Sequence, residues 1–406
     1  MPFPLPRLRA ALTVLVMTVA AVLSGPVPAA RAAGVALTPV TAFGSNPGQL
    51  SMYVHRPASL PASPPVVVAL HGCTQSAQVY ADHSGLPQVA ARAGFLLVFA
   101  EQRASNNLNK CFNWFQTSDS RRGQGEAASI RQMVAHAVAS YGADPRRVYV
   151  TGLSAGGAMT SVVLAAYPDV FAAGAVVAGV PYDCARDVAS AYSCMNPGVD
   201  LSPARWAQRV RDAYPAWTGP WPRVAVWQGD RDTTVVPRNA DELRDQWTAV
   251  HGLSPLPTRT SVIGPDSTRH EEYAAADGTV AVEVNRVPAI GHGTPVDPGT
   301  GPAQCGSTAA AYFLDSICSS HWIAGFFGLT DSGGGQTPPP GPGDGTASCW
   351  TGSNHHHVQA GRATTSGGST WAKGSLQGMG LYNTFVTHTL KESPAGYFAV
   401  ADGACP

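Results

Sequence analysis

The stretch Val148-Tyr-Val-Thr-Gly-Leu-Ser-Ala-Gly-Gly157 decides the fold of this chain. An apolar, β-branched run leads into Gly-x-Ser-x-Gly, and small residues suited to a helix follow. Gly152 and Gly156 lack the β-carbons that would clash across a sharp strand-to-helix turn, so Ser154 can sit at its tip with an exposed hydroxyl. The start of the helix then faces that hydroxyl and can stabilise an anion. The pattern predicts a nucleophile elbow.

Apolar runs that resemble strands alternate with helical patterns on both sides of this elbow. The expected strands are residues 66–70, 95–99, 148–151, 175–178 and 224–228. In the expected helix 126–141, apolar residues fall on one face. Strands that are apolar on both faces and joined by helical crossovers indicate a mostly parallel sheet. The expected fold class is therefore α/β, with a mostly parallel central sheet.

A serine nucleophile needs an orienting acid, a base and an oxyanion hole. In the α/β-hydrolase arrangement the triad follows the chain order serine, acid, histidine. The loop Gly229-Asp-Arg-Asp-Thr-Thr-Val235 follows an expected strand and offers two carboxylates. We predict Asp232 as the acid, because it has the Gly-x-x-Asp-x-x-Val spacing typical of this loop. Asp230 is the alternative, with a turn-stabilising role if Asp232 is the acid.

The base is expected on a later loop, after the last strand. His292 lies between two glycines and follows an apolar run at 282–287, so its ring has room to approach the serine. His270 and His251 are weaker rivals. In chain order, Ser154, Asp232 and His292 then form the predicted triad.

The predicted oxyanion hole combines two backbone N–H groups. The elbow supplies that of Ala155, and the loop after the strand 66–70 supplies that of Cys73. A bridge from Cys73 to Cys111 would hold this loop and bring Trp114 to the edge of the cleft, where we predict a substrate contact.

The N-terminal residues predict export from the cell. Arg7 and Arg9 precede an apolar run, and Ala30-Arg-Ala32 offers a cleavage site, so residues 1–33 are expected to be a signal peptide and the mature protein to be extracellular. A retained anchor is the alternative. The run is short for a bilayer span, and we expect no membrane partner. The 26 basic and 26 acidic residues among 406 argue against nucleic acid as a partner.

Eight cysteines in an exported chain, with no Cys-x-x-Cys pair, favour disulfides over zinc. Sequence does not fix their connectivity, and pairing of neighbours is our working prediction. It gives the pairs Cys73–Cys111, Cys184–Cys194, Cys305–Cys318 and Cys349–Cys405.

A Gly- and Pro-rich stretch, residues 331–346, predicts an extended linker. It separates a catalytic domain, 34–330, from a small segment, 347–406. That segment has short aromatic and Gly-rich runs without helical periodicity, and we expect it to be β-rich. A core so small needs a disulfide to be stable. A Cys349–Cys405 bridge would add about 4 kcal/mol to the free energy of unfolding by reducing the entropy of the unfolded chain.

Five motifs carry a family resemblance. They are Leu70-His-Gly-Cys-Thr-Gln75, Cys111-Phe-Asn-Trp-Phe115, Arg121-Arg-Gly-Gln-Gly-Glu126, Gly152-Leu-Ser-Ala-Gly-Gly-Ala-Met159 and Gly291-His-Gly-Thr-Pro-Val-Asp-Pro298. Together they resemble the secreted poly(3-hydroxybutyrate) depolymerases, which are related to feruloyl and acetylxylan esterases. The resemblance runs from about residue 35 to 324 and then continues in the tail. It implies triad roles for Ser154, Asp232 and His292, and the oxyanion-hole position for Cys73.

The tail is similar to the short substrate-binding domains of those depolymerases, in the runs 353–363 and 377–383. Relatives usually carry one histidine where this chain has His355 to His357. We do not predict a metal site, because adjacent side chains point in different directions and no cysteine or carboxylate completes a ligand set. Four aromatic residues can either adsorb to an apolar polymer or form the core: Trp350, Trp371, Tyr382 and Phe385.

The expected function is that of an exported serine esterase that hydrolyses poly(3-hydroxybutyrate) or related polyhydroxyalkanoates through an acyl-enzyme. We expect no metal or organic cofactor, a monomer, and an insoluble polyester surface as the partner. The alternative substrates are feruloyl or acetyl esters on plant polysaccharide. A protein of a different class, a catalytically silent adhesion protein, is the third hypothesis.

Overall fold

The computed structural model describes residues 1–2, 34–330 and 348–402, the last range with gaps at 367, 374–377 and 393–397. By compactness the chain divides into Met1–Gly34 and Val35–Pro406. The expected signal peptide, apart from residues 1–2, and the expected linker lie outside the described residues. Within the described part, no helix is long and apolar enough to cross a bilayer.

The strands and helices of the described residues belong to the second unit. The strands are β1 (Thr38–Val40), β2 (Ser51–His55), β3 (Val66–Leu70), β4 (Leu96–Glu101), β5 (Val148–Leu153), β6 (Ala173–Val177), β7 (Arg223–Gly229), β8 (Arg259–Ile263), β9 (Thr268–Ala274), β10 (Val280–Val287), β11 (Thr294–Val296), β12 (Phe313–Asp315), β13 (Ser348–Ser353), β14 (Ala363–Ser366), β15 (Ser369–Ala372), β16 (Gly378–Leu381), β17 (Thr387–Glu392) and β18 (Phe398–Val400). The helices are α1 (Ala77–His83), α2 (Leu86–Ala93), α3 (Thr117–Ser120), α4 (Gly125–Tyr141), α5 (Ala155–Ala166), α6 (Val188–Met195), α7 (Pro203–Ala213), α8 (Arg238–Val250), α9 (Ser319–Phe326) and α10 (Asn354–Gln359).

Ten strands form one sheet in the order β1-β2-β4-β3-β5-β6-β7-β10-β9-β8. The central strands, from β4 to β10 in this order, pair in parallel, and the two strands at each edge pair antiparallel. The chain therefore confirms the predicted mostly parallel sheet. Because β3 connects to β4 on one side and β5 lies on the other, the strand order switches between β3 and β5. Ligands of open parallel sheets bind beyond the carboxyl ends at such a point.

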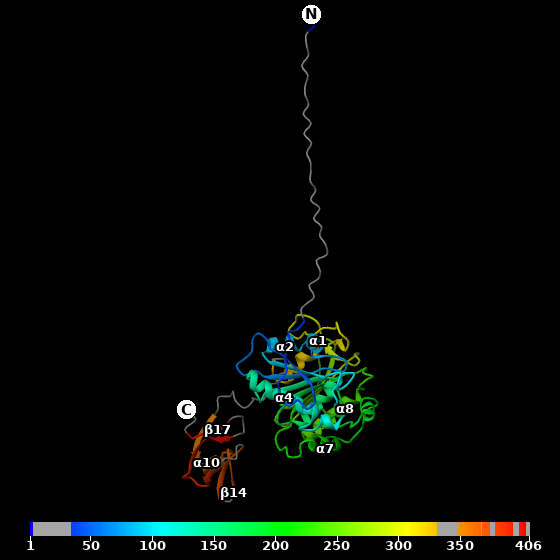
Figure 1. Ribbon diagram of the computed structural model, residues 1–406. Coiled ribbons are helices and arrows are strands. Elements are labelled where there is room, and N and C mark those ends of the chain that lie inside the picture. Colours follow the sequence, from blue (N-terminus) through cyan, green and yellow to red (C-terminus); the bar gives the residue numbers. More distant parts are fainter. Residues whose placement is uncertain (3–33, 331–347, 367, 374–377, 393–397, 403–406) are drawn as a thin grey trace. The chain divides into compact units, whose positions relative to one another are not determined.

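Successive residues of β3 alternate between two apolar cores, one on each face of the sheet. Val66, Val68 and Leu70 belong to the first core, with residues of α4, α5, α7 and α8. Val67 and Ala69 belong to the second, with α1, α2 and α9. Figure 1 shows α1 and α2 close together and α7 and α8 close together, on opposite sides of the strands. The sheet is thus covered on both faces, as its apolar strands predict.

The predicted elements match the observed ones closely. The strand 66–70 is β3 itself, and the strand 95–99 is β4, which begins one residue later and runs to Glu101. The helix 126–141 is α4, which begins one residue earlier at Gly125. It ends at Gly142, whose φ of 67° favours glycine.

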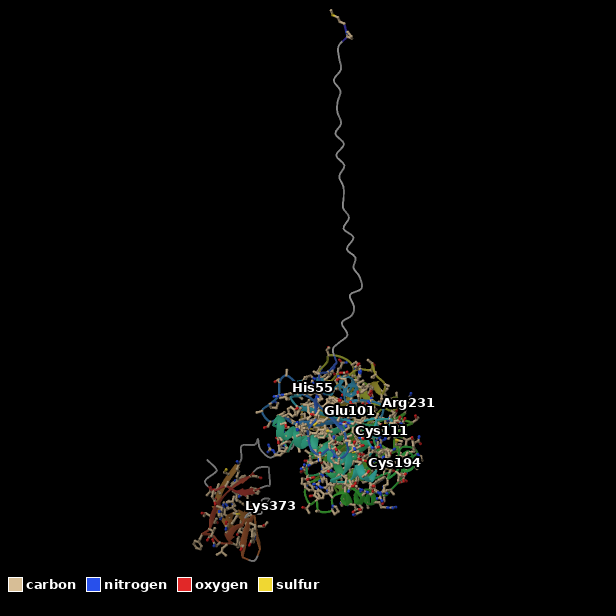
Figure 2. All side chains as sticks on the ribbon, viewed as in Figure 1. His55, Glu101, Cys111, Cys194, Arg231 and Lys373 are labelled. Carbon is tan, nitrogen blue, oxygen red and sulfur yellow. A yellow bond between two sulfur atoms is a disulfide. The ribbon has the colours of Figure 1, made fainter. Side chains whose placement is uncertain are left out.

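Three of the predicted disulfides are present: Cys73–Cys111, Cys184–Cys194 and Cys305–Cys318. Cys111 and Cys194, one partner from each of the first two, are labelled in Figure 2. The fourth predicted pair includes Cys405, which lies outside the described residues.

The tail contains two three-stranded sheets, β13-β17-β18 and β14-β15-β16, so the β-rich prediction is confirmed. The tail also contains one short helix among its described residues, although its sequence has no helical periodicity. The hydroxyl of Ser353 accepts the N–H of His356 and begins the short helix α10, which carries the three histidines. Their rings have different neighbours: His357 is buried with Nε2 2.9 Å from a backbone oxygen, whereas His355 lies against Tyr382.

Candidate active site

Ser154 stands on a strained turn between β5 and α5, with φ 57° and ψ −116°. The flanking glycines are sterically required. A β-carbon on Gly156 would lie 2.3 Å from the carbonyl oxygen of Leu70, and one on Gly152 would lie 2.5 Å from that of Gly156. The predicted sharp turn is therefore confirmed, and the reason is the close approach of the β3 and β5 ends. Ala155 is the first residue of α5, where an N–H has no acceptor within the helix.

The peptide between Gly72 and Cys73 has a fixed orientation. His71 Nδ1–H donates to the carbonyl oxygen of Gly72 (2.7 Å), and the N–H of Gln102 donates to Nε2 of the same ring (3.1 Å). Burial lowers the pKa of His71 to about 4, so the ring is neutral near pH 7 and satisfies both bonds in one tautomer. Because the C=O and N–H of a trans peptide point in opposite directions, the N–H of Cys73 points away from His71.

His292 and Asp232 form a partly buried pair, 60 residues apart in the chain, with 2.7 Å between Nδ1 and Oδ2. The Asp232 side chain is completely buried. Its Oδ1 accepts the N–H groups of Thr234 (2.8 Å) and Val235 (2.9 Å), and Gln228 Nε2 donates to Oδ2 (3.2 Å). A carboxylate at Nδ1 keeps the proton there and leaves Nε2 free to accept one.

The alternatives to this pair lie elsewhere. Asp230 is exposed, and its Oδ1 accepts the N–H of Ala289, which joins the two loops as a turn-stabilising contact. His270 is hydrogen-bonded to Asn285 on β10. His251 follows α8, and its Nε2 lies 3.0 Å from the carbonyl oxygen of Pro222, before β7.

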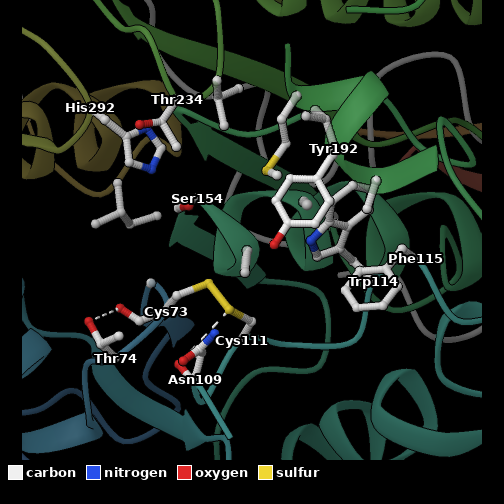
Figure 3. Close-up of a pocket in the computed structure, with 18 of the residues that line it drawn as sticks. Cys73, Thr74, Asn109, Cys111, Trp114, Phe115, Ser154, Tyr192, Thr234 and His292 are labelled. Carbon is white, nitrogen blue, oxygen red and sulfur yellow. Dashed lines mark hydrogen bonds between the residues drawn. A yellow bond between two sulfur atoms is a disulfide. The ribbon is translucent and has the colours of Figure 1, made fainter. Parts of the chain in front are cut away.

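A pocket of about 480 Å³ brings the predicted residues together. Ser154, Ala155, His292, Cys73 and Trp114 all line it. Figure 3 shows the His292 ring turned toward Ser154, with the Cys73–Cys111 bridge on the other side of the serine. Asp232 stands behind His292 and does not itself line the pocket.

The pocket wall is mainly apolar. Trp114 is buried against Phe115, with perpendicular rings 5.4 Å apart, and faces the pocket. Val188 and Tyr192 come from α6, and Tyr312 precedes β12. The sequence analysis missed these three residues, although the cysteine pairs that enclose them gave a signal: each pair closes a loop that reaches the pocket.

The mouth of the pocket exposes large apolar side chains. Tyr192 is 67% exposed, Val188 56% and Tyr312 44%. Leu108, between the lining residues Asn107 and Asn109, is 92% exposed. Exposed apolar groups gathered around a pocket indicate an apolar ligand or surface.

The mostly parallel sheet, the strained serine turn and the partly buried histidine–carboxylate pair define an esterase of the α/β-hydrolase fold. The chain belongs to the family described as Esterase PHB depolymerase, which it matches over residues 49–264. The family resemblance expected from the motifs is thereby confirmed, whereas the likeness of the tail to substrate-binding domains stays a prediction.

Relatives and a solved structure agree with this assignment. The chain is 50% identical over 295 residues to poly(3-hydroxyalkanoate) depolymerase C of Paucimonas lemoignei, covering 72% of this chain and 70% of the relative. It is 35% identical over 266 residues to acetylxylan esterase of Coprinopsis cinerea, covering 64% and 69%. The solved acetyl xylan esterase from Aspergillus awamori superposes with a TM-score of 0.61 at 27% identity, covering 73% of this chain and all of that one.

Proposed function

We propose that this esterase hydrolyses the ester bonds of poly(3-hydroxybutyrate) or related polyhydroxyalkanoates through an acyl-enzyme on Ser154. The observation that carries the proposal is the apolar wall and mouth of the pocket beside that serine. A polyester chain offers methyl and methylene groups between ester oxygens that only accept hydrogen bonds, and such a chain suits an apolar wall. Similarity to a poly(3-hydroxyalkanoate) depolymerase supports the same substrate class.

In the proposed mechanism, His292 Nε2 takes the proton of the Ser154 hydroxyl as Oγ attacks the ester carbonyl. Asp232 holds the Nδ1–H of the imidazolium that forms. The N–H groups of Cys73 and Ala155 donate to the tetrahedral oxyanion, and two such donors supply several kcal/mol. The intermediate collapses, the alcohol end of the polymer leaves with the proton from His292, and water then releases the acyl group by the same steps.

We propose the division 1–33, 34–330, 331–346 and 347–406 for signal peptide, catalytic domain, linker and polymer-binding domain. In the tail, Trp371 is 40% and Phe385 90% exposed, which supports adsorption through these two. Trp350 packs against Phe398 and contributes to the tail's small core instead. Attachment to an insoluble surface through a tether would raise the local concentration of ester bonds. The disulfides support an extracellular location.

Similarity to acetylxylan and feruloyl esterases keeps polysaccharide esters as the second candidate. The test measures release of soluble hydroxyacids from poly(3-hydroxybutyrate) films against release of acetate or ferulate from substituted xylan. We expect hydrolysis of the film to dominate and to disappear in Ser154→Ala. Dominant xylan deacylation would replace the proposed substrate, and full activity of Ser154→Ala would refute the mechanism. Adsorption without hydrolysis of any ester would favour the adhesion hypothesis.

A further inference from the structure

Glu126 is buried in the first turn of α4, and the proposed mechanism does not use it. Three donors converge on its carboxyl group: Gln102 Nε2, the N–H of Asn113 (2.8 Å) and Asn113 Nδ2 (2.9 Å). All three donors are neutral, and burial raises the pKa of Glu126 to about 8. A buried acid held only by neutral groups is a poor way to stabilise a fold.

One branch of the network reaches the loop after β3, which carries Cys73. Gln102 Nε2, which donates to Glu126, also donates to the carbonyl oxygen of Cys111 (3.0 Å). The backbone N–H of Gln102 donates to His71, whose other nitrogen donates to the carbonyl oxygen of Gly72. Glu126 thus acts on the peptide that presents the Cys73 N–H, through two intervening residues.

The second branch reaches the pocket wall. Asn113 Oδ1 accepts Asn107 Nδ2 (3.1 Å), and Asn107 Oδ1 accepts the N–H of Asn109 (3.0 Å). The carbonyl oxygen of Asn109 accepts the N–H of Thr74 (2.6 Å). Asn107, Asn109 and Thr74 line the pocket, as does Trp114, the residue after Asn113. Both branches therefore end around the Cys73–Cys111 bridge.

We propose that Glu126 is a positioning residue for catalysis. It holds Gln102 and Asn113 in place, so that the N–H of Cys73 stays oriented toward the tetrahedral oxyanion. The inference rests on the proposed function, because it takes Cys73 as an oxyanion donor. Glu126 itself lies outside the lining of the pocket and touches no substrate. Its effect belongs to the transition state, in which the oxyanion forms, and not to substrate binding.

The substitution Glu126→Gln is the sharpest perturbation that the structure offers. Both oxygens of Glu126 can accept a hydrogen bond, even when the acid is protonated, whereas an amide nitrogen cannot. Whichever way the new amide is turned, its NH₂ therefore faces a donor that it cannot accept. Gln102 and Asn113 cannot flip to compensate, because their own side-chain oxygens already accept from Asn106 and Asn107. One donor of the network is therefore left unpaired, and the loops it ties must shift.

The test measures kcat and KM of full-length Glu126→Gln on a soluble short-chain acyl ester, with the melting temperature as a check of folding. It adds the inhibition constant of a trifluoromethyl ketone, which a catalytic serine converts to a tetrahedral oxyanion. We expect kcat to fall about 10- to 100-fold, KM to stay within about threefold, and the inhibition constant to rise by the same factor as kcat falls. The matched control is Glu242→Gln, a buried glutamate that accepts Trp206 Nε1–H between α7 and α8. We expect this control to keep kcat and the inhibition constant, whatever stability it loses.

Values of kcat and of the inhibition constant within twofold of wild type in folded Glu126→Gln would overturn the inference. An equal loss in Glu242→Gln would also overturn it, because the effect would then be general destabilisation. If Glu126→Gln does not fold, Gln102→Met, which cuts the first branch and keeps the acid, is judged by the same readouts. Ser154→Ala separates the two proposals: if it remains active, the proposed function fails, and if it is inactive while Glu126→Gln is normal, only this inference fails.

Discussion

Replacing Asp232 by Asn should nearly abolish catalysis without removing any atom from the pocket. Oδ1 accepts two backbone N–H groups, so the amide oxygen of an asparagine takes that position and its NH₂ faces His292. The NH₂ then donates to Nδ1, which moves the ring proton to Nε2, where it blocks transfer from Ser154. Loss of the correct tautomer in a serine triad costs about 10⁴-fold in kcat, or roughly 5 kcal/mol of transition-state stabilisation.

The assay is the initial rate on a soluble acyl ester, with unfolding followed by circular dichroism to show that the variant folds. Asp230→Asn is the matched control. Its exposed amide oxygen can still accept the N–H of Ala289, so the rate should stay within about twofold of wild type. The reasoning is refuted if Asp232→Asn keeps a tenth of the wild-type kcat, or if the large loss appears in Asp230→Asn instead.

Three further predictions concern stability. Gly156→Ala puts a β-carbon 2.3 Å from the carbonyl oxygen of Leu70, so we expect a loss of about 1 to 3 kcal/mol in urea unfolding together with lost hydrolysis; an active variant of unchanged stability would contradict the steric argument. Replacing both Cys73 and Cys111 by Ala opens a loop of 38 residues and should cost about 4 kcal/mol in the same assay; a loss below 1 kcal/mol would contradict the entropic estimate. Because burial raises the pKa of Glu126 to about 8, the unfolded chain loses this proton first as pH rises. The stability of the wild type relative to Glu126→Gln should therefore fall between pH 4.5 and about 8, by at most about 5 kcal/mol, and a pH-independent difference would refute the raised pKa.

The central sheet could be predicted because its signals are local. The strand at 66–70 is apolar at every position, and the run before Ser154 needs glycines at two fixed places, so both are visible without knowledge of contacts. The antiparallel edge strands β8 and β9 were not predicted, because neither has an apolar pattern: β8 is largely exposed, and β9 buries polar residues such as His270 and Glu271. The short helix α10 was missed for a similar reason: its cap at Ser353 precedes three histidines rather than an amphipathic run.

The residues of the candidate site likewise divide into those with a local sequence signal and those without one. Asp232 and His292 follow strands whose carboxyl ends lie at the same edge of the sheet. Chain order, together with the Gly-x-x-Asp-x-x-Val spacing that favoured Asp232 over Asp230, selected the pair that the structure brings together. Their catalytic roles stay predictions. Val188, Tyr192 and Tyr312 reach the pocket from loops whose course depends on long-range packing, which periodicity does not encode. Glu126 stood in a recognised motif, but the role that we propose for it depends on partners from two other segments.

Each disulfide in the catalytic part described here closes a segment that contributes to the pocket. Asn109 lies within the first, Tyr192 within the second and Tyr312 within the third. The strand pairing of the sheet needs none of these bridges. A chain made in a reducing cytoplasm would therefore keep its apolar cores but lack the bridges that hold the segments around the pocket. Recombinant production therefore calls for an oxidising host compartment. Solubility or helix content alone does not show that the three disulfides have formed.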